Sequence, residues 1–315
     1  MPSLAASKIT PATLRRWPLP QPHPHGDKED RGSVLVIAGS DEIAGAALLA
    51  GTAALRAGAG KLTLAVPQSA CGALGVALPE ARVIGLPPTP DGGSMPDALG
   101  SVIDRSSAVL IGPGMQDEDV TLRLAQAVLA RVRHQAVVVD ALALAVLAHA
   151  PALPWLLATP HAGEMAHLVG HAKEAVLSDP AAYACEAAVR WPACIALKGA
   201  QTWIAAPSAA PGAAAQTQLW RFDGGRPSLA TSGSGDVLAG LAVGLAARGL
   251  GPVQTAAWAV FAHAEAGRRL EERHGGMGYL ARELPDLIPS VLNAPVPAGR
   301  APAPASSPRQ CGEPS

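Results

Sequence analysis

The sequence predicts an α/β fold in which a mostly parallel sheet is covered by helices on both faces. Short apolar runs alternate along the chain with segments whose apolar residues recur at the helical period. The runs are apolar throughout, which is typical of strands buried on both sides. The chain has 315 residues, of which 49% are hydrophobic and 16% charged, so it can bury a large core.

Strands and helices alternate from residue 34 onward. The expected strands are the runs at residues 34–38, 61–66, 109–111, 136–139, 156–158 and 195–197, with a further β-prone run at 202–205. The clearest helix follows Gly235, where Leu238, Leu241 and Leu245 share one stripe, and residues 253–264 repeat this period. In a parallel sheet of this kind, ligands bind at the carboxyl ends of the strands.

The chain divides into a leader, one domain and a tail. Residues 1–25 are rich in proline and charge, so we expect a flexible leader. Residues 26–292 contain no long linker and no tandem repeat, which favours a single domain. Residues 293–315 are rich in proline and alanine and hold almost no large apolar side chain, which predicts a disordered tail.

Charge and cysteine usage narrow the class of protein. Lys plus Arg number 24 and Asp plus Glu 25, so the net charge of -1 gives no reason to expect nucleic acid as a partner. No secretory signal opens the chain, and prolines interrupt the longest apolar stretch, residues 141–163, which argues against a membrane helix. The cysteines show no close pairs, as in proteins of a reducing compartment, so we expect a cytoplasmic protein.

The strongest single motif is the turn Ser232-Gly233-Ser234-Gly235-Asp236, which runs directly into a predicted helix. The first helical amides have no acceptor within the helix, and glycines let an anion approach closely, so the turn favours phosphate binding. Asp236 lies in the first turn, where the helix field favours an ionised carboxylate that can act as a base. The alternative is an ordinary helix start with a favourable acid, worth on the order of 1 kcal/mol.

Glycine turns follow several of the other expected strands. Lys198 and Gly199 come directly after one strand and suit a nucleotide phosphate, although an ordinary hairpin with an exposed lysine fits the same residues. Residues 39–45 and 112–114 follow two more strands, and neither matches a dinucleotide fingerprint or a Walker A loop. Together these turns bring accessible backbone to one edge of the sheet.

A polar segment follows the strand at residues 156–158. His161 and Glu164 could bond a polar ligand, and the alternative is that Thr159 or Glu164 caps the next helix. His167 and His171 are four residues apart but have no third ligand nearby, so they do not predict a metal site.

In their order along the chain, these motifs resemble those of the ADP-dependent (S)-NAD(P)H-hydrate dehydratase family of the ribokinase-like superfamily. The resemblance covers about residues 26–292 and rests on segments 32–40, 45–47, 112–114, 139–141, 159–164, 198–202 and 233–238. It implies a ribokinase-like three-layer α/β/α fold with a mostly parallel central sheet. The companion epimerase domain of the family is not found in the chain, so we expect the stand-alone form.

The resemblance implies a hydro-lyase that repairs nicotinamide cofactors hydrated at C6. The family restores NADH or NADPH from the S-epimer of NADHX or NADPHX and converts ADP to AMP and phosphate. ADP is therefore the implied nucleotide, and Mg²⁺ is in keeping with phosphoryl transfer. Asp236 would be the base that takes the hydroxyl proton of the substrate. A homo-oligomer such as a tetramer, and a separate epimerase as partner, are also implied.

The resemblance also assigns site residues one by one. The nucleotide would contact Lys198, Gly199, Ala200, Gln201, Thr202 and Gly235. The hydrated cofactor would contact Ala46, Gly114, His161 and Asp236. Metal ligands are not assigned. The chain departs from the usual family pattern at Leu142, Ala162 and Arg226, where the family commonly has Asp, Pro and Asn.

Two other functions fit the same residues. A small-molecule kinase of the same superfamily, for instance one acting on a vitamin hydroxymethyl group, would use the glycine turn and Asp236 unchanged. A non-catalytic nucleotide-binding protein would keep the turn without turnover, and it would tolerate Asp236→Asn.

Overall fold

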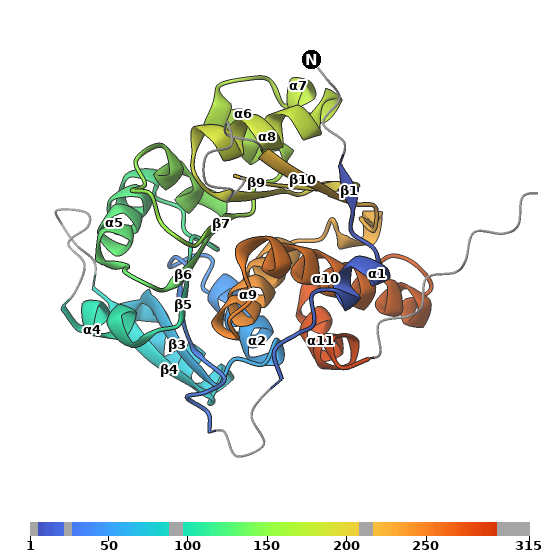
Figure 1. Ribbon diagram of the computed structural model, residues 1–315. Helices are drawn as coiled ribbons and strands as arrows, with labels where there is room; N and C mark the ends of the chain where they lie inside the picture. The colour runs from blue at the N-terminus through green and yellow to red at the C-terminus, as the bar shows by residue number, and fades with distance from the viewer. Residues whose placement is uncertain (1–5, 22–26, 88–96, 208–216, 295–315) are drawn as a thin grey trace, which may run out of the picture.

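The computed structural model describes residues 6–21, 27–87, 97–207 and 217–294, and a central sheet runs through them (Figure 1). In chain order the strands are β1 (Ser7–Lys8), β2 (Ser33–Ile37), β3 (Lys61–Pro67), β4 (Ala81–Leu86), β5 (Ala108–Ile111), β6 (Ala136–Val139), β7 (Leu156–Ala158), β8 (Cys194–Leu197), β9 (Thr202–Pro207) and β10 (Thr217–Phe222). Across the sheet their order is β1-β10-β9-β8-β7-β6-β5-β2-β3-β4. From β8 to β4 all neighbours are parallel, whereas β9 is antiparallel to β8 and β10. The mostly parallel sheet expected from the sequence is confirmed.

Every apolar run expected to be a strand is one, from β2 and β3 through β5 to β9. The sequence pattern does not predict β1, β4 and β10. β4 lies at the sheet edge with half-exposed residues, and Arg82 and Gly85 interrupt its apolar run. In β10, Gln218 and Arg221 alternate with the buried Leu219 and Phe222. A continuous apolar run therefore predicts the central strands but not the strands at or near an edge of the sheet.

The chain reverses its direction across the sheet between β2 and β5. From β2 it moves outward through β3 to β4, and it then returns to place β5 on the other side of β2. The carboxyl ends of β2 and β5 therefore flank a topological switch point, which is where open α/β sheets bind ligands.

Helices cover both faces of the sheet (Figure 1). One face carries α2 (Gly45–Arg56), α3 (Cys71–Ala77), α9 (Ser234–Ala247), α10 (Pro252–His274) and α11 (Leu284–Leu292). The other carries α4 (Asp97–Arg105), α5 (Glu118–Arg131), α6 (Ala162–Val169), α7 (Lys173–Ser178) and α8 (Pro180–Arg190). Two apolar cores, one on each side of the sheet, are built largely from Ala, Val and Leu. No helix among the described residues combines the length and the apolar character that crossing a membrane requires.

α9 is the central helix of its layer and carries the glycine turn at its amino end. Nearly all of its residues are buried. It lies directly against α2, because a Cβ at Gly240 would come within 2.1 Å of the carbonyl oxygen of Ala50. Only a residue without a side chain permits this approach. The close packing of α2 and α9 fixes the amino end of α9 beside the strand ends.

The described part of the expected leader, residues 6–21, is folded onto the domain rather than loose. β1 pairs with β10, and a short helix, α1 (Pro11–Arg15), follows it. Thr10 caps this helix, Leu14 is fully buried, and the indole Nε1 of Trp258 donates to the carbonyl oxygen of Trp17 over 2.7 Å. The expectation of a flexible leader rested on the proline-rich composition, which does not reveal the few apolar residues that anchor this segment. Residues 1–5, 22–26 and 295–315, which hold most of the expected tail, lie outside the described residues.

Candidate active site

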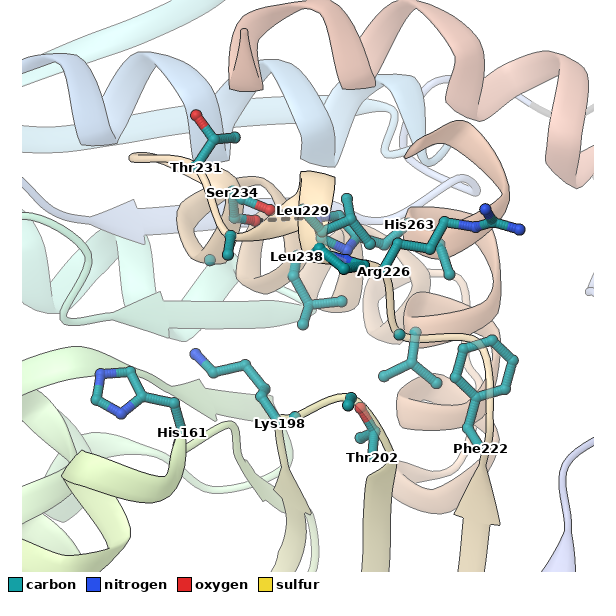
Figure 2. A pocket seen from close by; sticks show the side chains of 18 residues that line it. His161, Lys198, Thr202, Phe222, Arg226, Leu229, Thr231, Ser234, Leu238 and His263 are labelled. Carbon is teal, nitrogen blue, oxygen red and sulfur yellow. Dashed lines mark hydrogen bonds between the residues drawn. The ribbon is translucent and has the colours of Figure 1, made fainter. Parts of the chain in front are cut away.

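The strand ends named in the sequence analysis meet at the amino end of α9. A cavity of about 510 Å³ opens there. Figure 2 shows His161 and Lys198 at one end of it and Phe222 at the other. Apart from Phe222, the apolar residues Leu229, Leu238 and Val260 are among those that line it. The cavity can therefore take a ligand that has an anionic end and a flat apolar end.

Lys198 enters the cavity because its backbone continues the pairing of β7 and β8 beyond the strand ends. Its amide donates to the carbonyl oxygen of Pro160 over 2.8 Å, and it forms a parallel bridge with His161. The side chain is 17% exposed, and its Nζ donates to Asp140 Oδ1 over 2.8 Å. Glu164 Oε2 lies 3.9 Å from the same nitrogen.

Burial lowers the pKa of Lys198, but the neighbouring carboxylates outweigh burial and raise it above its ordinary value. The ammonium therefore remains charged. Lys198, Asp140, Glu164 and Asp236 interact electrostatically with one another, and we refer to them as the Lys198 cluster. One cation facing several carboxylates leaves net negative charge in a partly buried site.

Asp236 stands in the first turn of α9, as the sequence predicts. The helix begins after Gly233, whose φ of 85° ends the preceding turn. Burial raises the pKa of Asp236 to about 6, and Asp140 adds to the rise while Lys198 opposes it. The helix field was expected to favour ionisation, so the direction of the shift differs from that expectation. The carboxylate is still mostly ionised at neutral pH, and it is a stronger base than an ordinary aspartate.

His161 and Glu164 cap α6 as well as facing the cavity. His161 Nδ1 accepts from the amides of Gly163 and Glu164 over 3.0 and 3.1 Å, and Glu164 Oε2 accepts from the amide of His161 over 2.7 Å. The capping alternative is therefore confirmed for Glu164, whereas His161, and not Thr159, is the N-cap residue. Because Nδ1 accepts, Nε2 carries the ring proton of the neutral imidazole. This nitrogen belongs to a side chain that is 58% exposed at the cavity (Figure 2).

His263 belongs to the site although sequence reasoning missed it. It lies on α10 in the cavity wall, and its Nε2 is 3.0 Å from both Oγ and the carbonyl oxygen of Ser234 (Figure 2). Burial lowers the pKa of His263 to about 4, so the imidazole is neutral at neutral pH. Its one signal in the sequence is a histidine inside the apolar stripe of residues 253–264, which more often marks core packing.

The other predicted nucleotide contacts divide into two groups. Gly199, Ala200, Thr202 and Gly235 line the cavity with Lys198. Gln201 is exposed and does not line it.

Two predicted contacts of the hydrated cofactor lie apart from this cavity. Ala46 is buried in α2, and Gly114 sits against it, since a Cβ on Gly114 would be 2.5 Å from that of Ala46. Asp236 does not line the cavity either. It follows Gly235 in the wall, and the turn before it packs on Leu49 of α2, the helix that carries Ala46. Asp236 thus stands between the cavity and the start of α2.

The three departures from the expected pattern have clear positions. Arg226 lines the apolar part of the cavity, and its guanidinium bonds Glu271 of α10 over 2.5 Å. Ser228 donates to the same carboxylate, so this loop is tied to α10. Ala162 opens α6, and Leu142 lies in the 3₁₀ segment Ala141–Ala148 after β6. In the part of the chain that the structure describes, no group of three or more His, Cys, Asp and Glu could hold a metal ion.

Comparison with known proteins assigns the chain to one family. A family model described as NAD(P)H-hydrate dehydratase matches residues 34–290. The ADP-dependent (S)-NAD(P)H-hydrate dehydratase of Xanthomonas campestris pv. campestris is 44% identical over 290 residues, which are 90% of this chain and 96% of that protein. A bifunctional NAD(P)H-hydrate repair enzyme of Moorella thermoacetica is 38% identical over 90% of this chain, which spans 54% of its length.

Solved structures agree with this assignment. The ADP/ATP-dependent NAD(P)H-hydrate dehydratase from Bacillus subtilis, co-crystallised with ATP and Mg²⁺, superposes with a TM-score of 0.76 at 29% identity, covering 92% of this chain and 98% of that one. A ribokinase-like superfamily protein from Enterococcus faecalis has a TM-score of 0.78 at 23% identity, covering 91% and 95%. The ribokinase-like fold expected from the sequence is confirmed.

Proposed function

The chain belongs to the NAD(P)H-hydrate dehydratase family, and on this premise we propose that it dehydrates the S-epimer of hydrated NADH and NADPH with consumption of ADP. The products are NADH or NADPH, AMP and phosphate, and the enzyme is a hydro-lyase. The observation that carries the proposal is the position of Asp236, a carboxylate of raised pKa next to Gly235 in the wall of the cavity.

The proposed chemistry turns a poor leaving group into a good one. Asp236 takes the proton of the hydroxyl on C6, and the hydroxyl oxygen attacks the terminal phosphorus of ADP. The bond between that phosphorus and the bridging oxygen of AMP breaks. The ring nitrogen then donates its electron pair, the C6–O bond breaks, and phosphate departs. Loss of a proton from C5 of the resulting iminium ion to water forms the C5–C6 double bond of NADH or NADPH. The free amides at the start of α9 and the Lys198 ammonium would stabilise the charge on the transferring phosphoryl group.

The cavity accounts for the nucleotide in this proposal. Lys198, Gly199 and Gly235 would face the phosphates, and the apolar end around Phe222 and Leu229 would take the adenine ring. Mg²⁺ fits as a companion of the nucleotide rather than as a resident ion, because the described residues offer no cage of three ligating side chains. Mg²⁺ is commonly held by phosphates, waters and only one or two carboxylates.

The direct test is recovery of the near-ultraviolet absorbance of NADH after the purified protein is mixed with hydrated NADH, ADP and Mg²⁺. We expect recovery with ADP, formation of AMP, and no recovery without a nucleotide. No recovery, together with ATP-dependent phosphorylation of a vitamin alcohol, would identify a kinase instead. Binding of AMP without any turnover would identify a binding module. Parallel assays with ATP and with hydrated NADPH define the preferred substrates.

The remaining expectations from the sequence belong to the same proposal. They are a cytoplasmic location, a homo-oligomer such as a tetramer, and a separate epimerase that supplies the S-epimer. Native mass spectrometry of the full chain measures the oligomeric state. Dehydration of a mixture of epimers stops at the S fraction unless an epimerase is added, and this comparison tests the partner.

A further inference from the structure

Asp140 has no role in the proposed chemistry, yet the backbone around it is strained. It is 3% exposed and follows the last residue of β6. The next residue, Ala141, has a φ of 50°, and it is the one residue other than glycine with a positive φ in the described part of the chain. A side chain makes this conformation unfavourable, so it persists only where the surroundings impose it, and such residues cluster at functional sites.

The neighbouring strand ends fix Asp140 in place. A Cβ at Gly112, which follows β5, would lie 1.9 Å from the carbonyl oxygen of Asp140, so only glycine allows the two chains to approach this closely. On the other side, Thr159 after β7 donates its hydroxyl to Asp140 Oδ1 over 2.7 Å. The backbone of Asp140 is therefore packed against the end of β5, and its carboxylate is held from the end of β7.

The fixed carboxylate in turn holds Lys198. Asp140 Oδ1 accepts from Lys198 Nζ over 2.8 Å, and the same Nζ lies 3.6 Å from the position that a Cβ on Gly235 would take. The ammonium therefore bridges the end of β6 and the first turn of α9. Without Asp140 its remaining carboxylate neighbours are Glu164 and Asp236.

We propose that Asp140 is a positioning residue for the reaction, whose carboxylate holds the Lys198 ammonium at the first turn of α9 and keeps it from pairing with Asp236. The proposal rests on the proposed function. The strain at Ala141 is then the structural cost of aiming this carboxylate at Lys198. The Thr159 hydroxyl serves the same end.

Asp140 should also affect the acidic limb of the pH profile of kcat/KM, which reports the pH at which Asp236 loses its proton. Asp140, Glu164 and Lys198 are the charged groups that act on Asp236, and the neutral His263 lies behind the same turn on α10. Loss of the Asp140 charge removes a repulsion and frees the ammonium to approach Asp236. Both changes lower the pH at which Asp236 loses its proton.

The test is Asp140→Asn, which keeps the shape of the side chain. We expect kcat to fall about 10- to 100-fold, since a misplaced cation costs this much. The Michaelis constant for ADP should rise, and the acidic limb of kcat/KM should move about one pH unit lower. Asp104→Asn, near the amino end of β5, is the matched control. It should change neither kcat, nor the Michaelis constant, nor the acidic limb. An unchanged acidic limb, with activity lost only in proportion to a lower melting temperature, would overturn the proposal.

Two milder variants keep the test decisive if Asp140→Asn does not fold. Thr159→Val removes the hydroxyl that fixes Asp140, and Ala141→Gly relaxes the strained turn. Both should shift the acidic limb in the same direction by a smaller amount, and Ala141→Gly should do so without a lower melting temperature. Variants that fold but keep the parent profile contradict the proposal.

Calorimetric titration with ADP alone separates this proposal from the dehydratase function. If the parent does not dehydrate hydrated NADH, the proposed function fails. Weaker ADP binding by Asp140→Asn than by the parent would still support the positioning of Lys198, and equal binding would refute it.

Discussion

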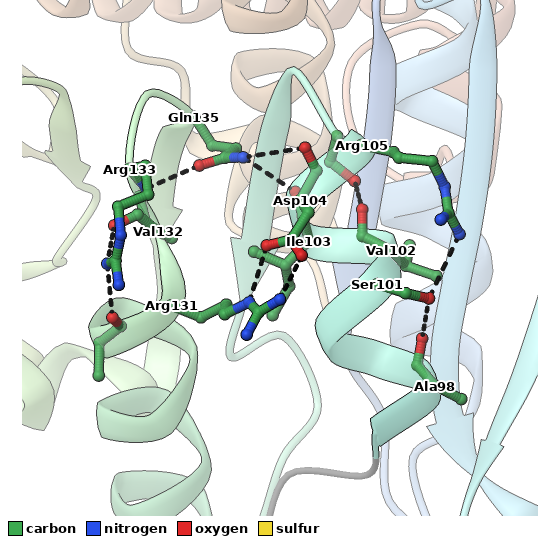
Figure 3. Close-up of polar contacts among 12 residues, drawn as sticks. Ala98, Ser101, Val102, Ile103, Asp104, Arg105, Arg131, Val132, Arg133 and Gln135 are labelled. Carbon is green, nitrogen blue, oxygen red and sulfur yellow. Dashed lines mark hydrogen bonds and ion pairs between the residues drawn. The ribbon is translucent and has the colours of Figure 1, made fainter.

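Two clusters of charged and polar side chains lie at opposite ends of the parallel strands. The Lys198 cluster stands at the carboxyl ends of the strands, beside the cavity. The Asp104 cluster, which we define as Asp104, Arg131 and Gln135, lies before the amino ends of β5 and β6 (Figure 3). Both tie together elements that are distant in the sequence. They differ in how well their charges are matched.

In the Asp104 cluster every group has its partner. The guanidinium of Arg131 donates two bonds to Asp104, one of them from Nε over 2.7 Å, and these bonds lower the pKa of Asp104. Gln135 is 1% exposed. Both polar atoms of its side chain form hydrogen bonds (Figure 3). Its Oε1 accepts from the amides of Arg133 and His134 over 2.9 and 3.2 Å, and its Nε2 donates to Ile103 O over 3.0 Å. Such satisfaction is what a structural cluster requires.

In the Lys198 cluster the charges are not matched, because carboxylates outnumber cations. Several carboxylates share one ammonium, and burial raises the pKa of both Asp236 and Glu164. An arrangement of this kind lowers the stability of the folded state while it supplies a base of suitable strength. The comparison suggests that mismatch in a partly buried cluster indicates chemistry, whereas complete pairing indicates a role in folding.

The largest expected effect is that of Asp236→Asn. Without the base, kcat should fall about 100- to 10,000-fold, measured as recovery of NADH absorbance. Stability should rise, because the pKa of Asp236 is higher in the folded than in the unfolded chain. Its protonation therefore stabilises the fold at low pH, and this contribution disappears as the pH rises through about 6. At pH 7 the variant avoids a penalty of about 1 to 2 kcal/mol, after allowance for solvent screening.

Urea unfolding at two pH values tests that statement. The gain in stability should be present at pH 7 and should shrink towards pH 4, where the parent carboxyl is protonated as well. Asp286→Asn, an exposed aspartate paired with Arg56, is the control and should leave activity unchanged. Retained activity in Asp236→Asn would remove the distinction between the two clusters.

The next effect concerns the single cation of the mismatched cluster. Lys198→Met should weaken ADP binding about 10- to 100-fold, as loss of a charge-assisted hydrogen bond does. Lys198 opposes the rise in the pKa of Asp236, so its removal should move the acidic limb of kcat/KM above its parent position. This direction is opposite to that expected for Asp140→Asn. Lys61→Met, at the start of β3, is the control, and the same shift in both variants would contradict the assignment.

The sequence alone predicts those parts of the site that depend on local pattern. A glycine turn that opens a helix, and polar residues placed directly after an apolar run, are visible without tertiary structure, and they locate Lys198, His161 and Asp236. The apolar runs likewise locate the central strands, since full burial on both faces selects their composition.

Relations through space are not visible in the same way. Asp140 stands in a recognised motif, but its proposed role depends on Thr159 and Lys198, which follow two other strands. His263 sits inside an apolar helix stripe, and only the approach of α9 to α10 brings it to Ser234. Edge strands such as β4 bury only part of their surface, so their sequences carry no continuous apolar run. The missing information is tertiary in each case.

A smaller effect, on stability alone, is expected in the matched cluster. Gln135→Leu leaves the amides of Arg133 and His134 and the carbonyl of Ile103 without the partners that Gln135 provides. The free energy of unfolding should fall by about 2 to 3 kcal/mol, which urea denaturation measures. The kcat of the folded protein should not change. Gln218→Leu, at an exposed position of β10, is the control for the added apolar surface.

The smallest effect on stability is expected for Asp104→Asn, and its pH dependence should be opposite to that of Asp236→Asn. Asp104 is exposed, so water and salt screen its pairing with Arg131. Its pKa is lowered in the folded chain, so its contribution to stability is present at neutral pH and disappears as the pH falls through the folded pKa. The melting temperature should therefore drop slightly at pH 7 and not at low pH, the reverse of Asp236→Asn. A carboxylate whose pKa is lowered supports the fold, and one whose pKa is raised weakens it. Equal pH trends in the two variants would show that the clusters do not differ in kind.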